Sequence, residues 1–244
     1  MLLLAAVFAA GLLAGFLNVM AGGGSMITLP ILIFLGLPAA AANGTNRVGI
    51  LVQNVAAVAG FWRQGYSDVR AGLIFSLTTV PGAIAGALVA VSVSDGAFRA
   101  CLAGVLLVAM TGLLFPSRRG TTGGHATTHA RALAFLGFFA IGFYGGFIQA
   151  GVGFLIMLVL HQLLGMDLVR TNMHKVLIVL VFSIPSLPVF IATSNVVWPT
   201  AIALSAGNAM GAVAATRVSV EGGERPIRIV VGLALLVMAV GLVS

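Results

Sequence analysis

The chain has 244 residues, of which 60% are hydrophobic and only 7% are charged. Soluble domains carry about a quarter charged residues, so this composition excludes an ordinary soluble protein and leaves no room for a separate soluble domain. The net charge of +7 does not indicate a nucleic-acid-binding protein, because the basic residues stand singly in short loops and form no patch with aromatic residues. We interpret them as signals of membrane topology.

Apolar segments recur along the whole chain and predict an all-α polytopic membrane protein. The ten segments are 2–20, 26–42, 46–62, 71–91, 97–115, 131–149, 154–165, 173–193, 198–216 and 227–243. A stretch rich in Ser, Thr and Gly, residues 116–130, separates the first five from the last five and is typical of an exposed linker. We therefore expect one integral membrane domain with a first repeat at 1–115, a linker at 116–130 and a second repeat at 131–244.

A glycine run interrupts the apolar pattern after the first segment. Gly22, Gly23 and Gly24 allow the backbone to turn and to approach a ligand closely, and Ser25 is expected to cap a new helix that begins at Met26. The free N–H groups and the positive dipole end of such a helix suit an anion. A plain glycine-rich turn between two helices is the alternative.

The glycine run occurs twice in the chain. Aligning residues 21–36 with 150–165 without a gap gives seven identities in sixteen positions, among them two glycines of the run. After a gap of three residues, Thr45-Asn46 matches Thr171-Asn172, and Gly82 and Gly86 match Gly207 and Gly211. The chain is therefore interpreted as an internal duplication, with the later Gly-xxx-Gly pairs serving close helix packing.

The basic residues predict how the segments cross the membrane. If the first two segments of each half form a hairpin that returns to its starting side, ten cations fall on one side and two, Arg47 and Arg99, on the other. A single broken span in each half would divide them seven to five. The positive-inside rule favours the hairpins, which place both termini outside and invert the second half relative to the first.

The hairpins are expected to be re-entrant. Segment 154–165 spans roughly 18 Å as a helix, against roughly 30 Å for the hydrocarbon core. The two glycine tips would enter from opposite faces and meet inside the membrane, where irregular backbone must be buried in protein or line a wet cavity. This requirement makes the tips a candidate binding site.

The polar residues favour an anion over a cation. All five carboxylates fall in loops or at segment ends, which disfavours a cation transporter or a proton pump. Arg47 and Lys175 are expected to open the helix after each hairpin, so that a cation and a free helix N-terminus occur together. Anchoring on the positive side is an equal alternative for Lys175, whereas binding is favoured for Arg47.

Other polar residues lie in apolar surroundings, where hydrogen bonds between helices are their ordinary role. They are Asn18, Gln53, Asn54, Gln149, His161, Gln162, His174 and Asn208. Gln149 differs from the others because it stands beside the second glycine run.

Three stretches carry a family resemblance: residues 15–25 running to Leu29-Pro30, residues 42–46, and residues 142–153. They resemble the sulfite exporter TauE/SafE family of bacterial membrane proteins over nearly the whole chain. The resemblance implies outward movement of sulfite, sulfoacetate or related sulfur-containing anions across the cytoplasmic (inner) membrane. The second tip, Gly151-Val152-Gly153, departs from the triple glycine of the family, so the first tip is expected to hold more of the anion.

We therefore expect a secondary transporter that exports a small sulfur-containing oxyanion, such as sulfite or an organosulfonate, by alternating access around the two tips. The expected binding residues are Gly22, Gly23, Gly24, Ser25, Thr45, Asn46, Arg47, Gln149, Gly151, Gly153, Thr171, Asn172 and Lys175. An anion channel and a carboxylate transporter are the alternatives. An enzyme is disfavoured because the sequence has no paired carboxylates, no Cys/His cluster and no nucleophile with an evident base.

The expected partners are the small anion and the lipid bilayer, and a homodimer is left open. No cofactor, metal or nucleic acid is expected.

Overall fold

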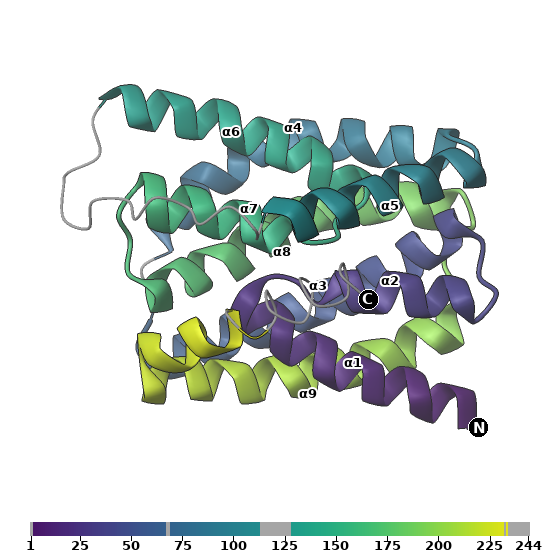
Figure 1. Cartoon of the computed structure of the whole chain (residues 1–244), viewed down its shortest axis with the longest axis horizontal. Helices are drawn as coiled ribbons and strands as arrows, with labels where there is room; N and C mark the ends of the chain where they lie inside the picture. The colour runs from purple at the N-terminus through teal and green to yellow at the C-terminus, as the bar shows by residue number, and fades with distance from the viewer. Residues whose placement is uncertain (1, 67–68, 113–127, 232, 234–244) are drawn as a thin grey trace.

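The computed structural model describes residues 2–66, 69–112, 128–231 and 233, and in these ranges all regular structure is helical (Figure 1). The helices are α1 (Leu2–Ala21), α2 (Ser25–Phe34), α3 (Ala39–Arg63), α4 (Arg70–Ser92), α5 (Asp95–Gly112), α6 (Thr128–Phe147), α7 (Val152–Met157), the π-helix η1 (Leu158–Leu163), α8 (Leu168–Ala192) and α9 (Trp198–Gly222). Most of the predicted linker and of the tenth predicted segment lies outside the described residues.

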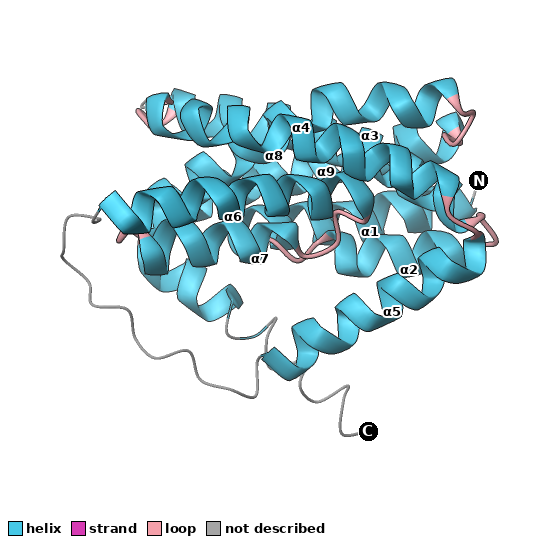
Figure 2. Ribbon diagram, turned by 90° about the horizontal axis from the view of Figure 1, so that it is seen from above, coloured by secondary structure: helices cyan, strands magenta, loops and turns pink. Residues whose placement is uncertain are grey.

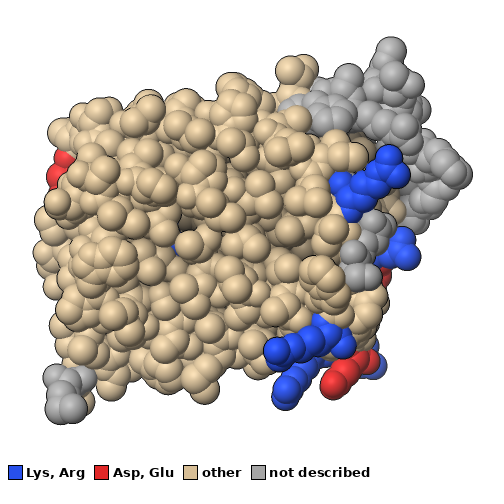
Figure 3. All heavy atoms as spheres, turned by 180° about the vertical axis from the view of Figure 1, so that it is seen from behind, with Lys and Arg blue, Asp and Glu red and all other residues tan. Residues whose placement is uncertain are grey.

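Three of the described helices are long and apolar enough to cross a membrane: Leu2–Ala21, Gly72–Ser92 and Leu168–Ala192. Figure 3 shows a face of the molecule that is almost free of charged side chains, with Lys and Arg gathered at one end and an acidic group at the other. Large apolar side chains such as Leu77, Ile202 and Leu136 are exposed. This surface suits a lipid environment, in which exposed apolar side chains face acyl chains.

The boundary predicted between the second and third segments is wrong. α2 ends at Phe34, where Gly36 adopts a φ of 90° and the N–H of Leu37 returns to the carbonyl of Leu32. This is the Schellman arrangement that commonly ends helices. α3 then begins at Ala39, so Arg47 lies about two turns inside the helix instead of at its start.

The helices form two groups, each with members from both halves of the chain. In the first group α9 packs against α1 and α3, and in the second α4 packs against α6 and α8. Figure 1 shows the first group below and the second above, with α3 and α8 meeting between them. Figure 2 shows α5 at the periphery of this bundle.

Close glycine contacts hold each group together, as the sequence predicts. A Cβ atom at Gly207 or Gly211 would overlap the backbone of α1, and one at Gly82 or Gly86 would overlap the backbone of α6. The predicted packing role of the two Gly-xxx-Gly pairs is therefore confirmed.

Two elbows interrupt the helices near the middle of the bundle. The first elbow, residues 22–24, joins α1 to α2, and the second elbow, residues 148–153, joins α6 to α7 and includes the first two residues of α7. α2 turns back toward the end of the bundle where α1 begins, whereas α7 and η1 turn back toward the opposite end (Figure 1). The elbows touch, because a Cβ atom at Gly22 would lie 2.5 Å from the carbonyl carbon of Gly153.

The contact between the elbows predicts that Gly22→Ala destabilises the fold more than Gly36→Ala does. Both glycines have positive φ, 88° and 90°, so each alanine suffers strain of about 1–2 kcal/mol. Gly36 has no atom within 4 Å of its Cβ position, whereas Gly22 faces the backbone of Gly153, which adds about 1–3 kcal/mol. Thermal unfolding of the purified variants measures the difference, and equal loss of stability would show that the elbows are not tightly packed.

Candidate functional site

A small cavity lies beside the contact between the two elbows. Its volume is about 10 Å³, which is room for about one water molecule. It is lined by Asn18, Ser25, Ile50, Asn54, Gln149, Val152, Gly153, Lys175 and Val179. The cavity thus lies between the two helix groups, with α1 and α3 on one side and the second elbow and α8 on the other.

Lys175 places its buried amino group at this cavity. Its side chain is buried, and Nζ donates to the carbonyl of Val19 at 2.6 Å and to Oδ1 of Asn172 at 2.7 Å. The third neighbour is Sδ of Met157 at 3.8 Å, and a thioether is a weak acceptor. The amino group therefore has one neighbour that is only a weak acceptor, on a residue that lines the cavity.

Arg47 is buried in the opposite half of the site. Its Nη2 atom donates to the carbonyls of Gly145, at 2.9 Å, and Gly146, and its Nη1 donates to Oγ of Ser186 at 3.3 Å. The guanidinium also lies 4.6 Å from the centre of the Phe190 ring, a cation–π contact. These contacts hold Arg47 against α6 and α8, and it is not among the residues that line the cavity.

The prediction that each cation stands at the N-terminus of its helix is wrong. Arg47 and Lys175 lie about two turns inside α3 and α8. Each side chain donates instead to carbonyls near the C-terminus of the helix that leads into the elbow of the other half. Arg47 reaches the end of α6, and Lys175 reaches the end of α1. Cations are stabilised there because the helix dipole leaves partial negative charge on those carbonyls.

Neither cation has a carboxylate partner within the described residues. The ion pairs of that part of the chain are Asp95–Arg99, Asp167–Arg170 and Glu224–Arg228, all partly exposed. A buried charge without a counter-ion is unfavourable, and dipoles offset only part of its desolvation. Both side chains are therefore held by backbone and side-chain dipoles instead of by counter-ions.

Ser25 lines the cavity, but it does not cap α2 as predicted. It is the first residue of the helix, and Gly24 occupies the cap position in a helical conformation (φ −56°, ψ −38°) without a side-chain hydrogen bond. Because Gly24 already has helical φ and ψ angles, α2 begins at Ser25, one residue before the predicted start at Met26. The N–H groups of Met26 and Ile27 donate to the carbonyls of Gly23 and Gly24, so the first turn of α2 is closed by the glycine run.

The glycines of the elbows serve mainly close packing. Gly23 faces the Phe154 ring, Gly24 faces the carbonyl of Ala14, and Gly151, with a φ of 71°, faces the side chain of Met26. Gly153 both touches Gly22 and lines the cavity.

The two Thr-Asn pairs make contacts with neighbouring segments instead of lining the cavity. Thr45 accepts a hydrogen bond from the N–H of Val197, and Oδ1 of Asn46 accepts one from Thr28 at 2.7 Å. In the other half, Asn172 donates to the carbonyl of Met20 and accepts from Lys175. Thr171 lies 3.5 Å from the carbonyl of Met166. Asn172 thus positions the ammonium group that lines the cavity.

Gln149 has a strained backbone at the cavity wall. It is 1% exposed and has a φ of 65°, a conformation that non-glycine residues rarely adopt. Its Nε2 donates to Oγ of Ser183 at 3.2 Å, whereas Oε1 has no hydrogen-bond partner among the described residues. Strain of this kind persists where the surrounding structure imposes it, often at functional sites.

Asn18 and Asn54 are cavity residues that the sequence did not single out as ligands. Both stand out in the sequence as polar residues in apolar segments, but so do several residues outside the cavity. Nδ2 of Asn54 donates to the carbonyl of Ile50 in its own helix at 2.7 Å. The amides give the cavity a polar wall without adding charge.

The apolar surface, the helical bundle and the small cavity between the two helix groups are typical of an integral membrane protein. The chain belongs to the sulfite exporter TauE/SafE family, whose model matches residues 7–242. It is therefore a multi-pass membrane transporter and not an enzyme.

Similar proteins from several bacteria carry matching descriptions. A "Probable membrane transporter protein ORF9" of Sinorhizobium sp is 29% identical over 242 residues, covering 96% of this chain and 91% of the relative. A probable membrane transporter protein of Haemophilus influenzae is 26% identical, covering 93% and 89%, and the Escherichia coli K12 protein YfcA, described in the same words, is 28% identical, covering 98% and 88%. No solved structure matches the chain.

The positive φ at residue 149 predicts that Gln149→Gly is more stable than Gln149→Ala by about 1–2 kcal/mol, because glycine adopts this conformation without strain. Both variants lose the amide at the cavity wall and the hydrogen bond to Ser183 to the same extent. Both should therefore transport equally poorly despite their different stabilities. Thermal unfolding and flux into liposomes measure the two effects separately, and equal stability would contradict the assigned strain.

Proposed function

We propose that the protein is a secondary transporter that exports a small sulfur-containing oxyanion, such as sulfite or an organosulfonate, across the bacterial inner membrane. The observation that carries the proposal is Lys175, a buried ammonium group that lines the cavity at the elbows and has no carboxylate partner among the described residues. The proposed substrate, sulfite, and the proposed direction of transport, export, are taken from the description of the family.

In this proposal the anion binds between the elbows. The third proton of Lys175 donates to an oxyanion oxygen, and Ser25, Asn18 and Asn54 surround it with polar groups. The N–H groups of Gly23 and Gly24 at the start of α2 and of Gly151 and Gly153 at the start of α7 add the positive ends of two helix dipoles. Gly22, whose own N–H donates to the carbonyl of Asn18, lets the two elbows touch. Asn172 and Gln149 position the ligand. The surrounding helices are held by Arg47, Thr45, Asn46 and Thr171, and the charge of Arg47 keeps the electrostatic potential at the site positive.

We further propose that the two halves are inverted repeats and that α1–α2 and α6–α7–η1 are re-entrant hairpins. In support, α1 packs on α9 as α6 packs on α4, and equivalent glycines make both contacts. The short arm α2 has 10 residues, which is about 15 Å of helix and half the hydrocarbon thickness. Inverted repeats with broken helices at the midplane are a known transporter design.

We also propose an orientation of the protein in the membrane, based on its basic residues. Arg63 ends α3, Arg70 begins α4 and Arg170 lies in the first turn of α8, all at the end of the bundle where α3 ends. The positive-inside rule makes this the cytoplasmic end and leaves the start of α1 outside.

A carrier fits the cavity better than an anion channel does. The cavity has room for about one water molecule, whereas conduction requires a continuous wet path. A small carboxylate would meet the same charge at Lys175, so the flux assay should include acetate as a competitor.

We expect Lys175→Met to reduce sulfite or methanesulfonate flux into liposomes at least tenfold, since the change removes the cation from the cavity while keeping a side chain of similar length. Arg170→Met is the matched control, because it removes a cation from the same helix at an exposed ion pair and should leave flux unchanged. Undiminished flux in a folded Lys175→Met protein would remove Lys175 from the site.

A further inference from the structure

A carboxylate far along the chain holds the first residue of α3. The backbone N–H of Ala39, which lacks an intrahelical partner, donates to Oδ1 of Asp95. Oδ2 of the same carboxylate accepts a hydrogen bond from Nε of Arg99 at 2.7 Å. Asp95 begins α5 just after the end of α4, so this contact fastens the corner between α4 and α5 to the start of α3.

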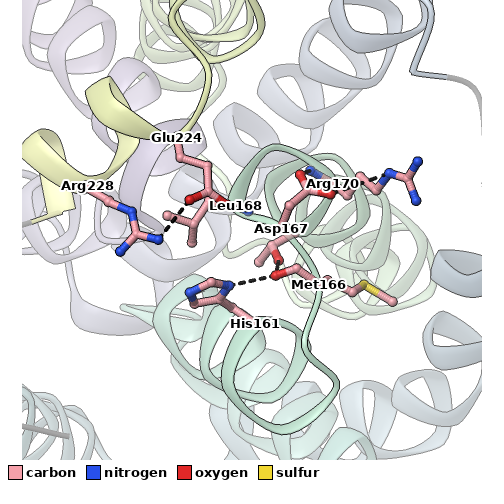
Figure 4. Close-up of polar contacts among 8 residues, drawn as sticks. His161, Met166, Asp167, Leu168, Arg170, Glu224 and Arg228 are labelled. Atoms are coloured by element: carbon pink, nitrogen blue, oxygen red, sulfur yellow. Dashed lines mark hydrogen bonds and ion pairs between the residues drawn. The ribbon is translucent and has the colours of Figure 1, made fainter. Parts of the chain in front are cut away.

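The start of α8 is held in the same way. The backbone N–H of Leu168 donates to Oε1 of Glu224 at 3.1 Å, and Nη2 of Arg228 donates to Oε2 at 2.8 Å. Figure 4 shows Glu224 between Leu168 and Arg228, with His161 bound to the carbonyl of Met166 nearby. Glu224 follows the end of α9, so this contact fastens the end of α9 to the start of α8.

The two contacts are equivalent in the two halves of the chain. The spacing from Ala39 to Asp95 and from Leu168 to Glu224 is 56 residues in both cases, and each arginine follows its carboxylate by four. Adding 129 to 39, 95 and 99 gives 168, 224 and 228, which is the offset that aligns Ala21 with Ala150. We call these contacts the Asp95 latch and the Glu224 latch.

The latches lie at opposite ends of the boundary between the two helix groups. In Figure 1 the starts of α3 and α5 lie at one end of the bundle, and the start of α8 and the segment after α9 lie at the other. α3 and α9 belong to one group and α4 and α8 to the other, so each latch joins the two groups. The cavity lies between the groups and between the latches.

The electrostatics of both latches favour the charged carboxylate. The hydrogen bond from Ala39 and then Arg99 lower the pKa of Asp95, and Arg228 and then the N–H of Leu168 lower the pKa of Glu224. The side chains are 45% and 37% exposed, so water can replace the helix amide when a latch opens. These contacts are therefore both specific and reversible.

We propose that Asp95 and Glu224 are positioning residues that close the two ends of the transport pathway, each by latching its side of the boundary between the helix groups. Both latches are formed in this structure, and the cavity between them is small, as an occluded state requires. Opening one latch while the other stays closed lets the groups separate at one end and exposes the cavity to one side of the membrane.

This inference rests on the alternating access of the proposed function, and it is tested with a reporter that needs no substrate. Ser25→Cys places a thiol at the cavity, and Cys101→Ser removes the exposed native cysteine. A charged, membrane-impermeant methanethiosulfonate is applied to right-side-out and to inside-out vesicles. Asp95→Ala should raise the labelling rate roughly three- to tenfold from one face only, and Glu224→Ala by a similar factor from the opposite face only.

Asp167→Ala is the matched control. Asp167 caps the same end of α8 by accepting a hydrogen bond from the N–H of Arg170, but it belongs to the local turn and joins no second group. It should lower thermal stability and leave labelling from both faces unchanged. Asp95→Glu and Glu224→Asp, which keep a carboxylate, should restore part of the closed behaviour.

Increased labelling from both faces in either alanine variant, or the same effect in Asp167→Ala, would overturn the latch assignment. Should an alanine variant fail to fold, Asp95→Asn and Glu224→Gln keep an oxygen acceptor for the helix amide and should raise labelling by a smaller factor from the same single face. Unchanged labelling in them would also overturn it. Side-specific labelling in a protein that transports no sulfur-containing anion would contradict the proposed substrate and would still support the latch assignment.

Discussion

The structure depends on two buried cations that have no carboxylate partner among the described residues. Arg47 and Lys175 are held by the carbonyls that end α6 and α1, so each half of the chain supplies the cation that stabilises the broken helix of the other half. Helix dipoles offset part of the desolvation of these charges but do not neutralise them. The fold therefore keeps two buried basic side chains in an apolar body, and the proposed anion site is built around one of them.

Arg47 and Lys175 differ in their hydrogen-bond partners and in whether they line the cavity. Arg47 uses both Nη atoms on two carbonyls and a hydroxyl, and its Nε, which has no partner among the described residues, lies on a side chain that does not line the cavity. Lys175 does line the cavity, and one of its three neighbours there is a thioether. A planar fork satisfied on several sides suits a structural role, and a compact ammonium suits a ligand that arrives and leaves. If the two halves are repeats, as proposed, their two cations have different contacts.

Much of this could be predicted from the sequence. The glycine runs, repeated at a fixed offset, indicated two elbows that meet, and Ser25, Gln149, Gly153 and Lys175 line the cavity. The helix starts could not be predicted, because the turn at Gly36 looks like any apolar break until its φ is known. The hydrogen-bond targets of Arg47 were equally hidden, since they are backbone carbonyls of a distant helix. The latches were visible in principle, as Asp95 and Glu224 share the offset of the glycine runs.

The most direct test of the anion site is crystallographic, with selenite as an analogue of sulfite that scatters anomalously. The account predicts one anomalous peak between the elbows, within about 3–4 Å of Nζ of Lys175, where a charge-assisted hydrogen bond forms. A selenite bound only at the ends of the bundle, or none at concentrations that inhibit sulfite flux, would contradict it.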